Sequence, residues 1–231
     1  MTGRVLAALV TIGLAVTLSA CTGSSRSGGG KQASAAAAAP GGSARSHAAY
    51  QRIGGAAQGV SLEVPGSWIT VNFSDQTVKQ AVGVLGGQGA SVDTSLTQEL
   101  TPLAKLHAVY AADVSSASTA PGHFATNLNA YCASSGISQA GSAGVAIIGR
   151  TWASELEQVG AQNLTQTAAR LGKTAGVRSS YTLSTSSAGQ LHAVQLEVLP
   201  ESGRACFVTL TAAGPVPATV LSRAVATIQY P

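Results

Sequence analysis

The chain has 231 residues, of which 45% are hydrophobic, 10% charged and only 4% aromatic. Its 13 Lys and Arg outnumber its 9 Asp and Glu, but four of the basic residues and none of the acidic ones precede His47, so the rest of the chain is neutral. A neutral domain with few aromatic residues lacks the basic face and the stacking surfaces of nucleic-acid-binding proteins, so no nucleic-acid partner is expected.

Residues 1–20 have the three parts of a secretory signal peptide. Arg4 supplies the positive start, residues 5–18 form the apolar part, and Ser19-Ala20 are the small residues before a cleavage site. The apolar run of about 14 residues is shorter than the roughly 20 that a membrane-spanning helix needs. The segment therefore predicts export and removal of the signal, and no membrane-spanning helix.

The residues Leu18-Ser19-Ala20-Cys21 resemble the lipobox of bacterial lipoproteins. The resemblance implies cleavage between Ala20 and Cys21, and acyl chains such as palmitate on Cys21. These chains would hold the protein on the extracytoplasmic face of the cell membrane, and more than one chain is needed for stable anchoring. The alternative is an ordinary secreted protein that keeps a cysteine near its cleavage site.

The segment from Cys21 to residue 46 is rich in Gly, Ser and Ala and has almost no apolar bulk. Such a composition predicts a flexible tether between the anchor and a globular domain at residues 47–231. Arg26 and Lys31 either favour anionic lipid near the anchor or are simply solvated linker charges.

The domain shows both strand and helix periodicity. In chain order we expect strands at 60–64 and 69–73, helices at 75–85 and 96–110, a strand at 124–132, helices at 152–159 and 164–171, strands at 177–184, 191–199 and 204–212, and a final helix at 220–228. A Gly- and Ser-rich loop is expected at 134–144. Three strands in succession predict an antiparallel meander, so the expected fold is α+β, a sheet covered by helices.

Several segments resemble the PsbP-like superfamily, and the LpqN-type actinobacterial lipoproteins in particular. They are Val60-Ser-Leu-Glu-Val-Pro-Gly-Ser-Trp68, Phe124-Ala-Thr-Asn-Leu-Asn129, Tyr181-Thr-Leu, Leu191-His-Ala-Val-Gln-Leu and Cys206-Phe-Val-Thr-Leu-Thr-Ala212. The resemblance covers residues 60–230 and implies an α/β/α sandwich with a central antiparallel sheet. Because the superfamily consists mostly of accessory and binding proteins, it implies no catalytic residues.

Cys132 and Cys206 are an even pair in an exported domain, where disulfides persist. Both fall at core-facing positions of expected strands. A bridge between them would stabilise the fold by about 4 kcal/mol in the chain-entropy model. The alternative is two separate buried thiols, since a free cysteine packs well in a core.

The candidate catalytic residues form no recognisable motif. A Ser-His-Asp hydrolase is the sharpest enzymatic alternative, but no Gly-x-Ser-x-Gly sequence occurs. Its available residues are His47, His107, His123, His192, Asp75, Asp93 and Asp113. No metal-ligand spacing is present, so we expect neither a metal nor another cofactor.

The residues Gly172-Lys173-Thr174 resemble the end of a phosphate-binding loop. They lack the glycine that such a loop has five positions earlier, and they follow an expected helix. We therefore interpret Gly172 as the end of that helix.

These features predict a lipid-anchored, extracytoplasmic binding or accessory protein without catalytic activity. Its expected partner is an envelope protein or a small apolar ligand. The alternatives are a carrier of lipids or other hydrophobic solutes and a serine hydrolase of unrecognised type. No ligand-binding residue is identified, and the Gly-rich segments Gly83–Ser91 and Ser134–Gly144 are the expected places for a site.

Overall fold

The computed structural model describes residues 49–86, 94–135, 137, 141–186, 188–200 and 203–231. The predicted signal peptide, Cys21 and the tether lie outside these residues. The strands are β1 (Tyr50–Gly55), β2 (Val60–Pro65), β3 (Ile69–Asn72), β4 (Val109–Asp113), β5 (Thr126–Ser134), β6 (Gln162–Leu171), β7 (Thr174–Thr185), β8 (Gly189–Val198) and β9 (Arg204–Ala212). The helices are α1 (Val78–Gly86), α2 (Thr94–Lys105), α3 (Gly141–Gln158) and α4 (Ala218–Thr227), with 3₁₀ turns at Val114–Ser118 and Pro121–His123.

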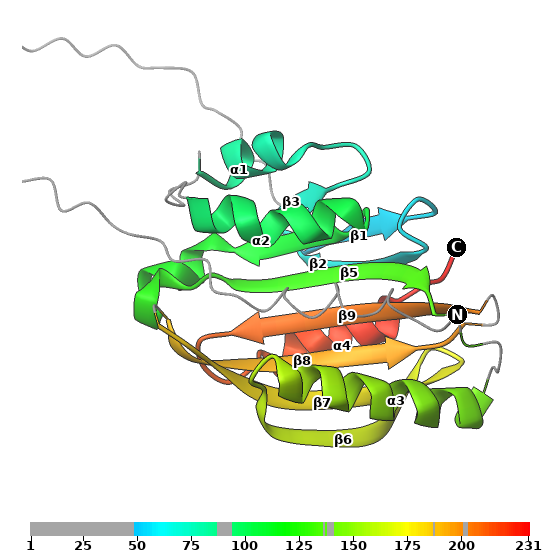
Figure 1. Ribbon diagram of the computed structural model, residues 1–231. Helices are drawn as coiled ribbons and strands as arrows, with labels where there is room; N and C mark the ends of the chain where they lie inside the picture. The colour runs from blue at the N-terminus through cyan, green and yellow to red at the C-terminus, as the bar shows by residue number, and fades with distance from the viewer. Residues whose placement is uncertain (1–48, 87–93, 136, 138–140, 187, 201–202) are drawn as a thin grey trace, which may run out of the picture.

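Seven of the strands form one antiparallel sheet in the order β3-β4-β5-β9-β8-β7-β6 (Figure 1). Strands β6 to β9 are consecutive in the chain and pair as a meander. Strand β9 then pairs with β5, so the last strand of the meander joins the two halves of the chain at the middle of the sheet. Strands β1 and β2 form a separate antiparallel hairpin. The predicted combination of a large antiparallel sheet with covering helices is confirmed.

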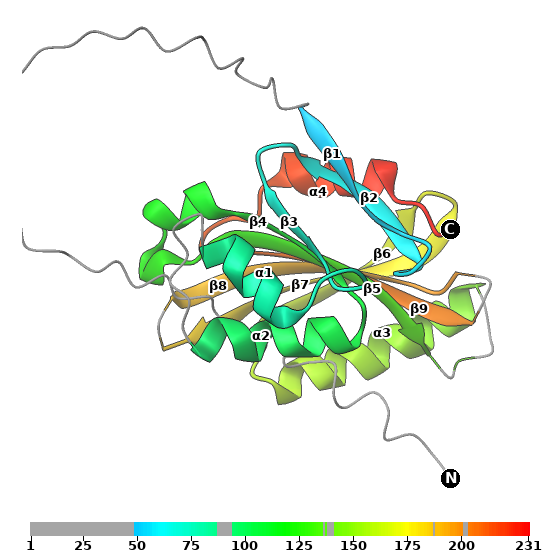
Figure 2. The ribbon, with the colours of Figure 1, turned by 90° about the horizontal axis from the view of Figure 1, so that it is seen from above.

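Helices α1, α2 and α3 cover one face of the sheet (Figure 2). Their apolar residues recur three or four positions apart, which places them on one side of each helix. The buried residues that these helices contribute are Ala81, Val82, Leu85, Leu96, Leu100, Leu103, Ile148, Trp152 and Leu156. Trp152 lies against Phe207 of β9, with ring centroids 4.7 Å apart, and so fixes α3 over the centre of the sheet.

Helix α4 and the β1–β2 hairpin cover the opposite face (Figure 2). Val60, Leu62 and Val64 of β2 are fully buried, as the alternation in the sequence predicts. The backbones of Ser61 and Gln229 bond to each other, which ties β2 to the segment after α4.

The cysteine pair predicted from the sequence is brought together on this second face. Cys132 of β5 and Cys206 of β9 are directly opposite each other in the ladder and form a disulfide, with Cα atoms 4.0 Å apart. The bridge joins the two halves of the chain at the centre of the sheet.

The helix predicted at 164–171 is wrong, because these residues form the edge strand β6. Gly172 and Lys173 connect β6 to β7 as a two-residue turn, and Gly172 has a φ of +61° that suits glycine there. Gly172 is therefore a hairpin residue and not the end of a helix. Leu164, Ala168 and Leu171 are spaced as in a helix, but hydrogen bonding to β7 holds their segment in a strand.

Three other elements differ from the expectations. Tyr110, placed at the end of a helix, lies in β4, because α2 stops at Lys105 and a turn follows. Helix α3 begins at Gly141, inside the expected loop. Strand β1 was not predicted, since its buried apolar content is limited to Ile53.

Candidate functional site

A groove of about 530 Å³ lies between α3 and the β6–β7 hairpin at one edge of the sheet. Its volume is within the range of small-molecule binding sites. Helix α3 contributes Val145, Ala146, Gly149 and Arg150, and the hairpin contributes residues 166–170 and 175–177.

The groove exists because small residues meet where a helix crosses a hairpin. Ala146, Ala168 and Ala175 leave space that larger side chains would fill. Gly149 lies close to the sheet, and a Cβ there would be 3.1 Å from the Val177 side chain. Gly176 has no room for a side chain, because a Cβ would lie 2.3 Å from the Glu197 carbonyl oxygen. The inner wall of the groove is therefore apolar, and its backbone packs closely against neighbouring residues of the sheet.

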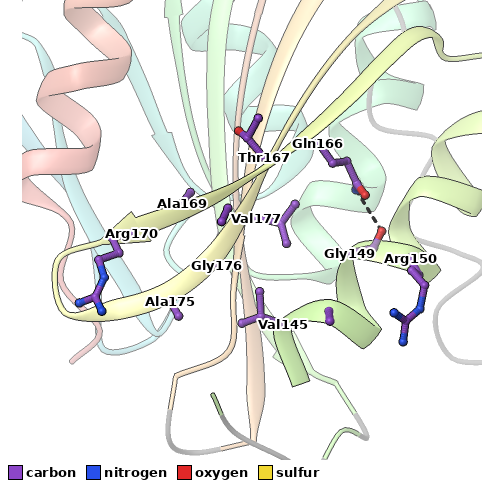
Figure 3. Close-up of a pocket in the computed structure, with 12 residues that line it drawn as sticks. Val145, Gly149, Arg150, Gln166, Thr167, Ala169, Arg170, Ala175, Gly176 and Val177 are labelled. Carbon is purple, nitrogen blue, oxygen red and sulfur yellow. Dashed lines mark hydrogen bonds between the residues drawn. The ribbon is translucent and has the colours of Figure 1, made fainter. Parts of the chain in front are cut away.

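Gln166 of β6 lines the groove and reaches the backbone of α3 (Figure 3). Its Nε2 donates to the Gly149 carbonyl oxygen of α3, at 3.0 Å, and to the Ser179 hydroxyl oxygen of β7, at 3.1 Å. Arg150 and Arg170 line the outer part of the groove and are exposed. Among the described residues neither of them forms an ion pair.

A buried hydrogen-bond network continues inward from Gln166. Ser179 donates to Oε1 of Glu197, at 2.9 Å, and Gln195 Nε2 donates to the same oxygen, at 3.4 Å. Gln195 Oε1 accepts from Thr209 at 3.1 Å and from the Tyr181 hydroxyl at 3.5 Å. These residues lie side by side on neighbouring strands, so the network crosses the sheet beneath α3.

Glu197 is the most unusual member of the network. Its side chain is fully buried, and burial raises the pKa of its carboxyl group to about 8. The hydrogen bonds from Ser179 and Gln195 oppose this shift without cancelling it, and the charge of Glu155 adds to it. At neutral pH the carboxyl group is therefore mostly protonated. Burial also raises the pKa of the neighbouring Tyr131 and Tyr181 hydroxyls.

Two smaller hollows lie elsewhere in the described part of the chain. One, of about 100 Å³, is on the other flank of α3 and is lined by Ser134, Ser135 and Ile137 of the expected loop, together with Trp152 and Phe207. The other, of about 350 Å³, lies near the disulfide. It is lined by Gly59, Thr174, Pro200, Arg204, Cys206, Tyr230 and Pro231.

The described residues of the two loops expected to carry a site do not line the large groove. In the segment Gly83–Ser91, Gly83 belongs to α1 and residues 87–91 lie outside the described residues. In the segment Ser134–Gly144, residues 136 and 138–140 lie outside the described residues. The groove residues Val145 and Ala146 come directly after this segment. The groove residues were missed because alanines and glycines on a helix and a hairpin carry no chemical signal in a sequence.

The described histidines lie in three separate elements. His107 is in the turn after α2 and is exposed, His123 is at the end of a 3₁₀ turn, and His192 is in β8. His47 and Asp93 lie outside the described residues. Asp75 and Asp113 are engaged locally: Asp75 accepts from Asn72, and Asp113 accepts from Ser115.

The described residues show neither a metal-binding cluster nor a membrane-spanning helix. They contain no group of three or more His, Cys, Asp or Glu side chains placed to hold a metal ion. No helix among them is long and apolar enough to cross a membrane.

Comparison with known proteins gave no match: no family model and no curated protein is similar to this chain.

Proposed function

We propose that the protein is a binding protein that holds a small apolar ligand in the groove between α3 and the β6–β7 hairpin. The observation that carries the proposal is the groove itself, about 530 Å³ lined mainly by alanine, glycine and valine. Apolar lining with a few polar groups is typical of sites that bind apolar molecules. The proposal assigns the protein no catalytic activity.

The proposal includes a cellular location and a family. Residues 1–20 are a signal peptide, and acyl chains on Cys21 hold the protein on the extracytoplasmic face of the cell membrane. The segment up to residue 46 is a tether. The domain is PsbP-like and of the LpqN type, which agrees with the antiparallel sheet and its helical cover.

Native mass spectrometry of the unanchored domain from His47 to Pro231, purified without detergent from its own export compartment, tests the ligand. A reproducible extra mass that is lost on denaturation is expected. Ala146→Trp fills the groove and should abolish the extra mass, because Ala146 lines it and is exposed. Ser154→Trp is the matched control, since Ser154 is exposed on the same helix but outside the groove. An adduct that survives Ala146→Trp would contradict the proposed location.

The anchor is tested separately by Cys21→Ala. The variant should be released into the medium or remain unprocessed, and the mature protein should lose the mass of its acyl chains. Retention at the membrane with no change in mass would contradict the lipid anchor.

The edge strand β6 favours a second candidate, an envelope protein as partner. Nine of its ten residues are exposed or partly exposed along the outer edge of the sheet, where a strand of another protein would pair. A photo-reactive residue at Thr165, in intact cells, should then give one discrete protein adduct. The same residue at Ser154 should not. Equal labelling from both positions would contradict pairing at β6.

A further inference from the structure

The charged residues in the lining of the groove between α3 and the β6–β7 hairpin are two arginines. Arg150 belongs to α3 and Arg170 to β6, and both side chains are exposed. Neither forms an ion pair or a side-chain hydrogen bond with another described residue. The other lining residues are uncharged, so a mainly apolar groove carries two unpaired positive charges.

The two arginines lie at opposite ends of the groove (Figure 3). At the Arg150 end the helix and the hairpin are joined, because the carbonyl oxygen of the preceding residue, Gly149, accepts from Gln166 at 3.0 Å. Arg170 lies beside the β6–β7 turn, where a Cβ on Gly172 would meet no described atom within 4 Å. The groove is therefore bridged at the Arg150 end and open to solvent at the Arg170 end.

The floor of the groove between these ends is formed by residues of the β6–β7 hairpin. Side chains two positions apart in a strand share a face. Three facing pairs of the ladder lie on the α3 side, namely Arg170-Ala175, Ala168-Val177 and Gln166-Ser179. Along β6 the first pair is about 13 Å from the third, at roughly 3.3 Å per residue. The floor thus passes from a positive charge through an apolar middle to the polar Gln166.

We propose that the groove binds a carboxylate with one apolar chain, whose charged group pairs with Arg170. The inference rests on the proposed function and names the chemical class of the ligand. The planar guanidinium group of arginine donates two parallel hydrogen bonds to a carboxylate, and one guanidinium balances one negative charge. The chain lies along Ala168 and Val177, and its end points towards the bridged end of the groove.

Arg150 has a smaller role in this arrangement. It adds positive charge to the same groove, which favours an anion over a cation. Because Arg150 lies at the far end (Figure 3), and charges in solution are screened over about 8 Å at physiological salt, its effect on the carboxylate is weaker than that of Arg170.

The test uses the mature chain from Cys21 to Pro231 with Cys21→Ser, so that no acyl chain occupies the groove. Displacement of the fluorescent apolar probe N-phenyl-1-naphthylamine is measured with decanoate, 1-decanol and decyltrimethylammonium, which share one chain length. Ala146→Trp, which fills the groove, should abolish binding of the probe. We expect decanoate to displace the probe at a concentration about tenfold lower than decyltrimethylammonium, because the arginines attract one head group and repel the other.

Variants of the arginines then locate the carboxylate. Arg170→Gln should weaken decanoate binding about threefold, the effect of one exposed ion pair, and should leave 1-decanol unchanged. Arg170→Lys keeps the charge without the two parallel donors, so its decanoate affinity should lie between those of wild type and Arg170→Gln. Arg178→Gln is the matched control, because Arg178 is exposed on the same hairpin but does not line the groove. It should leave decanoate binding unchanged, and Arg150→Gln should weaken it less than Arg170→Gln does.

The outcomes separate the inference from the proposed function. If Arg170→Gln affects decanoate no more than Arg178→Gln does, or weakens 1-decanol equally, the carboxylate assignment is overturned, while displacement by 1-decanol still supports an apolar ligand. A loss from Arg150→Gln as large as that from Arg170→Gln overturns the placement of the carboxylate at the open end. If Ala146→Trp still binds the probe, or no compound displaces it from the wild-type groove, the proposed function fails, and the inference with it.

Discussion

The two faces of the seven-stranded sheet use alternate residues of the same strands but differ in chemistry. On the face under α4 and the β1–β2 hairpin, the rows that cross β5, β9 and β8 are entirely apolar. They are Leu128-Leu210-Val194, Ala130-Val208-Leu196 and Cys132-Cys206-Val198. On the face under α3, one row is entirely polar across five strands, Asn129-Thr209-Gln195-Ser179-Gln166.

The difference separates a face with apolar rows at its centre from a face that buries polar groups. Burying polar groups destabilises a protein unless every group is paired, and an apolar row in the same place would pack at least as well. The polar row and Glu197 lie beneath the one helix that borders the large groove. Both faces are built on extensive apolar clusters, but the α3 face also buries a polar row and a carboxyl group at its centre.

Loss of the disulfide should have the largest effect on stability. The Cys132→Ala/Cys206→Ala double variant opens a loop of 74 residues and should lower the free energy of unfolding by about 4 kcal/mol. Urea unfolding of the oxidised wild type and the variant measures this difference, and the reduced wild type should match the variant. A loss below about 1 kcal/mol would mean that the α4 face is stable without its bridge.

Glu197→Gln should change stability in the opposite direction. The carboxyl pKa of Glu197 rises from 4.5 to about 8 on folding. The folded state therefore holds a proton that the unfolded state loses, and the stability linked to this group is complete below pH 4.5 and is lost as the pH rises to about 8. At pH 7 the loss is about 3 kcal/mol, which the neutral glutamine avoids.

The measurement is urea unfolding of wild type and Glu197→Gln between pH 4.5 and 8. The two curves should meet near pH 4.5 and diverge above it, with the variant more stable. Glu157→Gln, at an exposed position near the end of α3, is the control and should show no such divergence. Parallel pH dependence of wild type and Glu197→Gln would show that Glu197 ionises normally in the folded protein.

Two adjacent serines of β7 face opposite sides of the sheet, so their variants allow the two faces to be compared. Ser179 faces α3, is fully buried, and bonds to both Gln166 and Glu197, whereas the next residue, Ser180, faces the other way. Ser179→Ala should lower the free energy of unfolding by about 1–2 kcal/mol, because it leaves buried partners unpaired. Ser180→Ala should change it by less than about 0.5 kcal/mol. Equal effects would contradict the distinction between the faces.

The α4 face is the part that sequence reasoning predicted best. Alternation identified β2, β5, β8 and β9, and the phase of Cys132 and Cys206 placed both on a buried face. Apolar residues at a regular period are a direct signal, because burial of one face of a strand is what produces the pattern. The register that brings the two sulfur atoms together required the long-range pairing of β5 with β9.

The α3 face was predicted poorly for physical reasons. The β6 residues are mostly exposed, and their strand structure depends on pairing with β7 across a two-residue turn. The spacing of their few apolar residues therefore predicted a helix wrongly. Ser179 and Gln195 look like solvent-facing residues of half-buried strands, and α3 covers them only in the fold. A glutamate inside an otherwise apolar strand end, Leu196-Glu197-Val198, was the available signal for the buried polar network.

The smallest predicted effect lies on the outer surface of the α4 face, where Glu63 of β2 bonds to two arginines. Oε1 accepts from Arg52 at 3.2 Å and Oε2 from Arg223 at 2.5 Å, but both arginine side chains are about 40% exposed. Water and salt screen such pairs, so Glu63→Gln should lower the free energy of unfolding by only about 0.5 kcal/mol at low salt and less in 1 M NaCl. Urea unfolding at the two salt concentrations measures this. A loss above about 2 kcal/mol that salt does not reduce would mean that polar contacts, and not the apolar rows alone, hold the hairpin and α4 to the sheet.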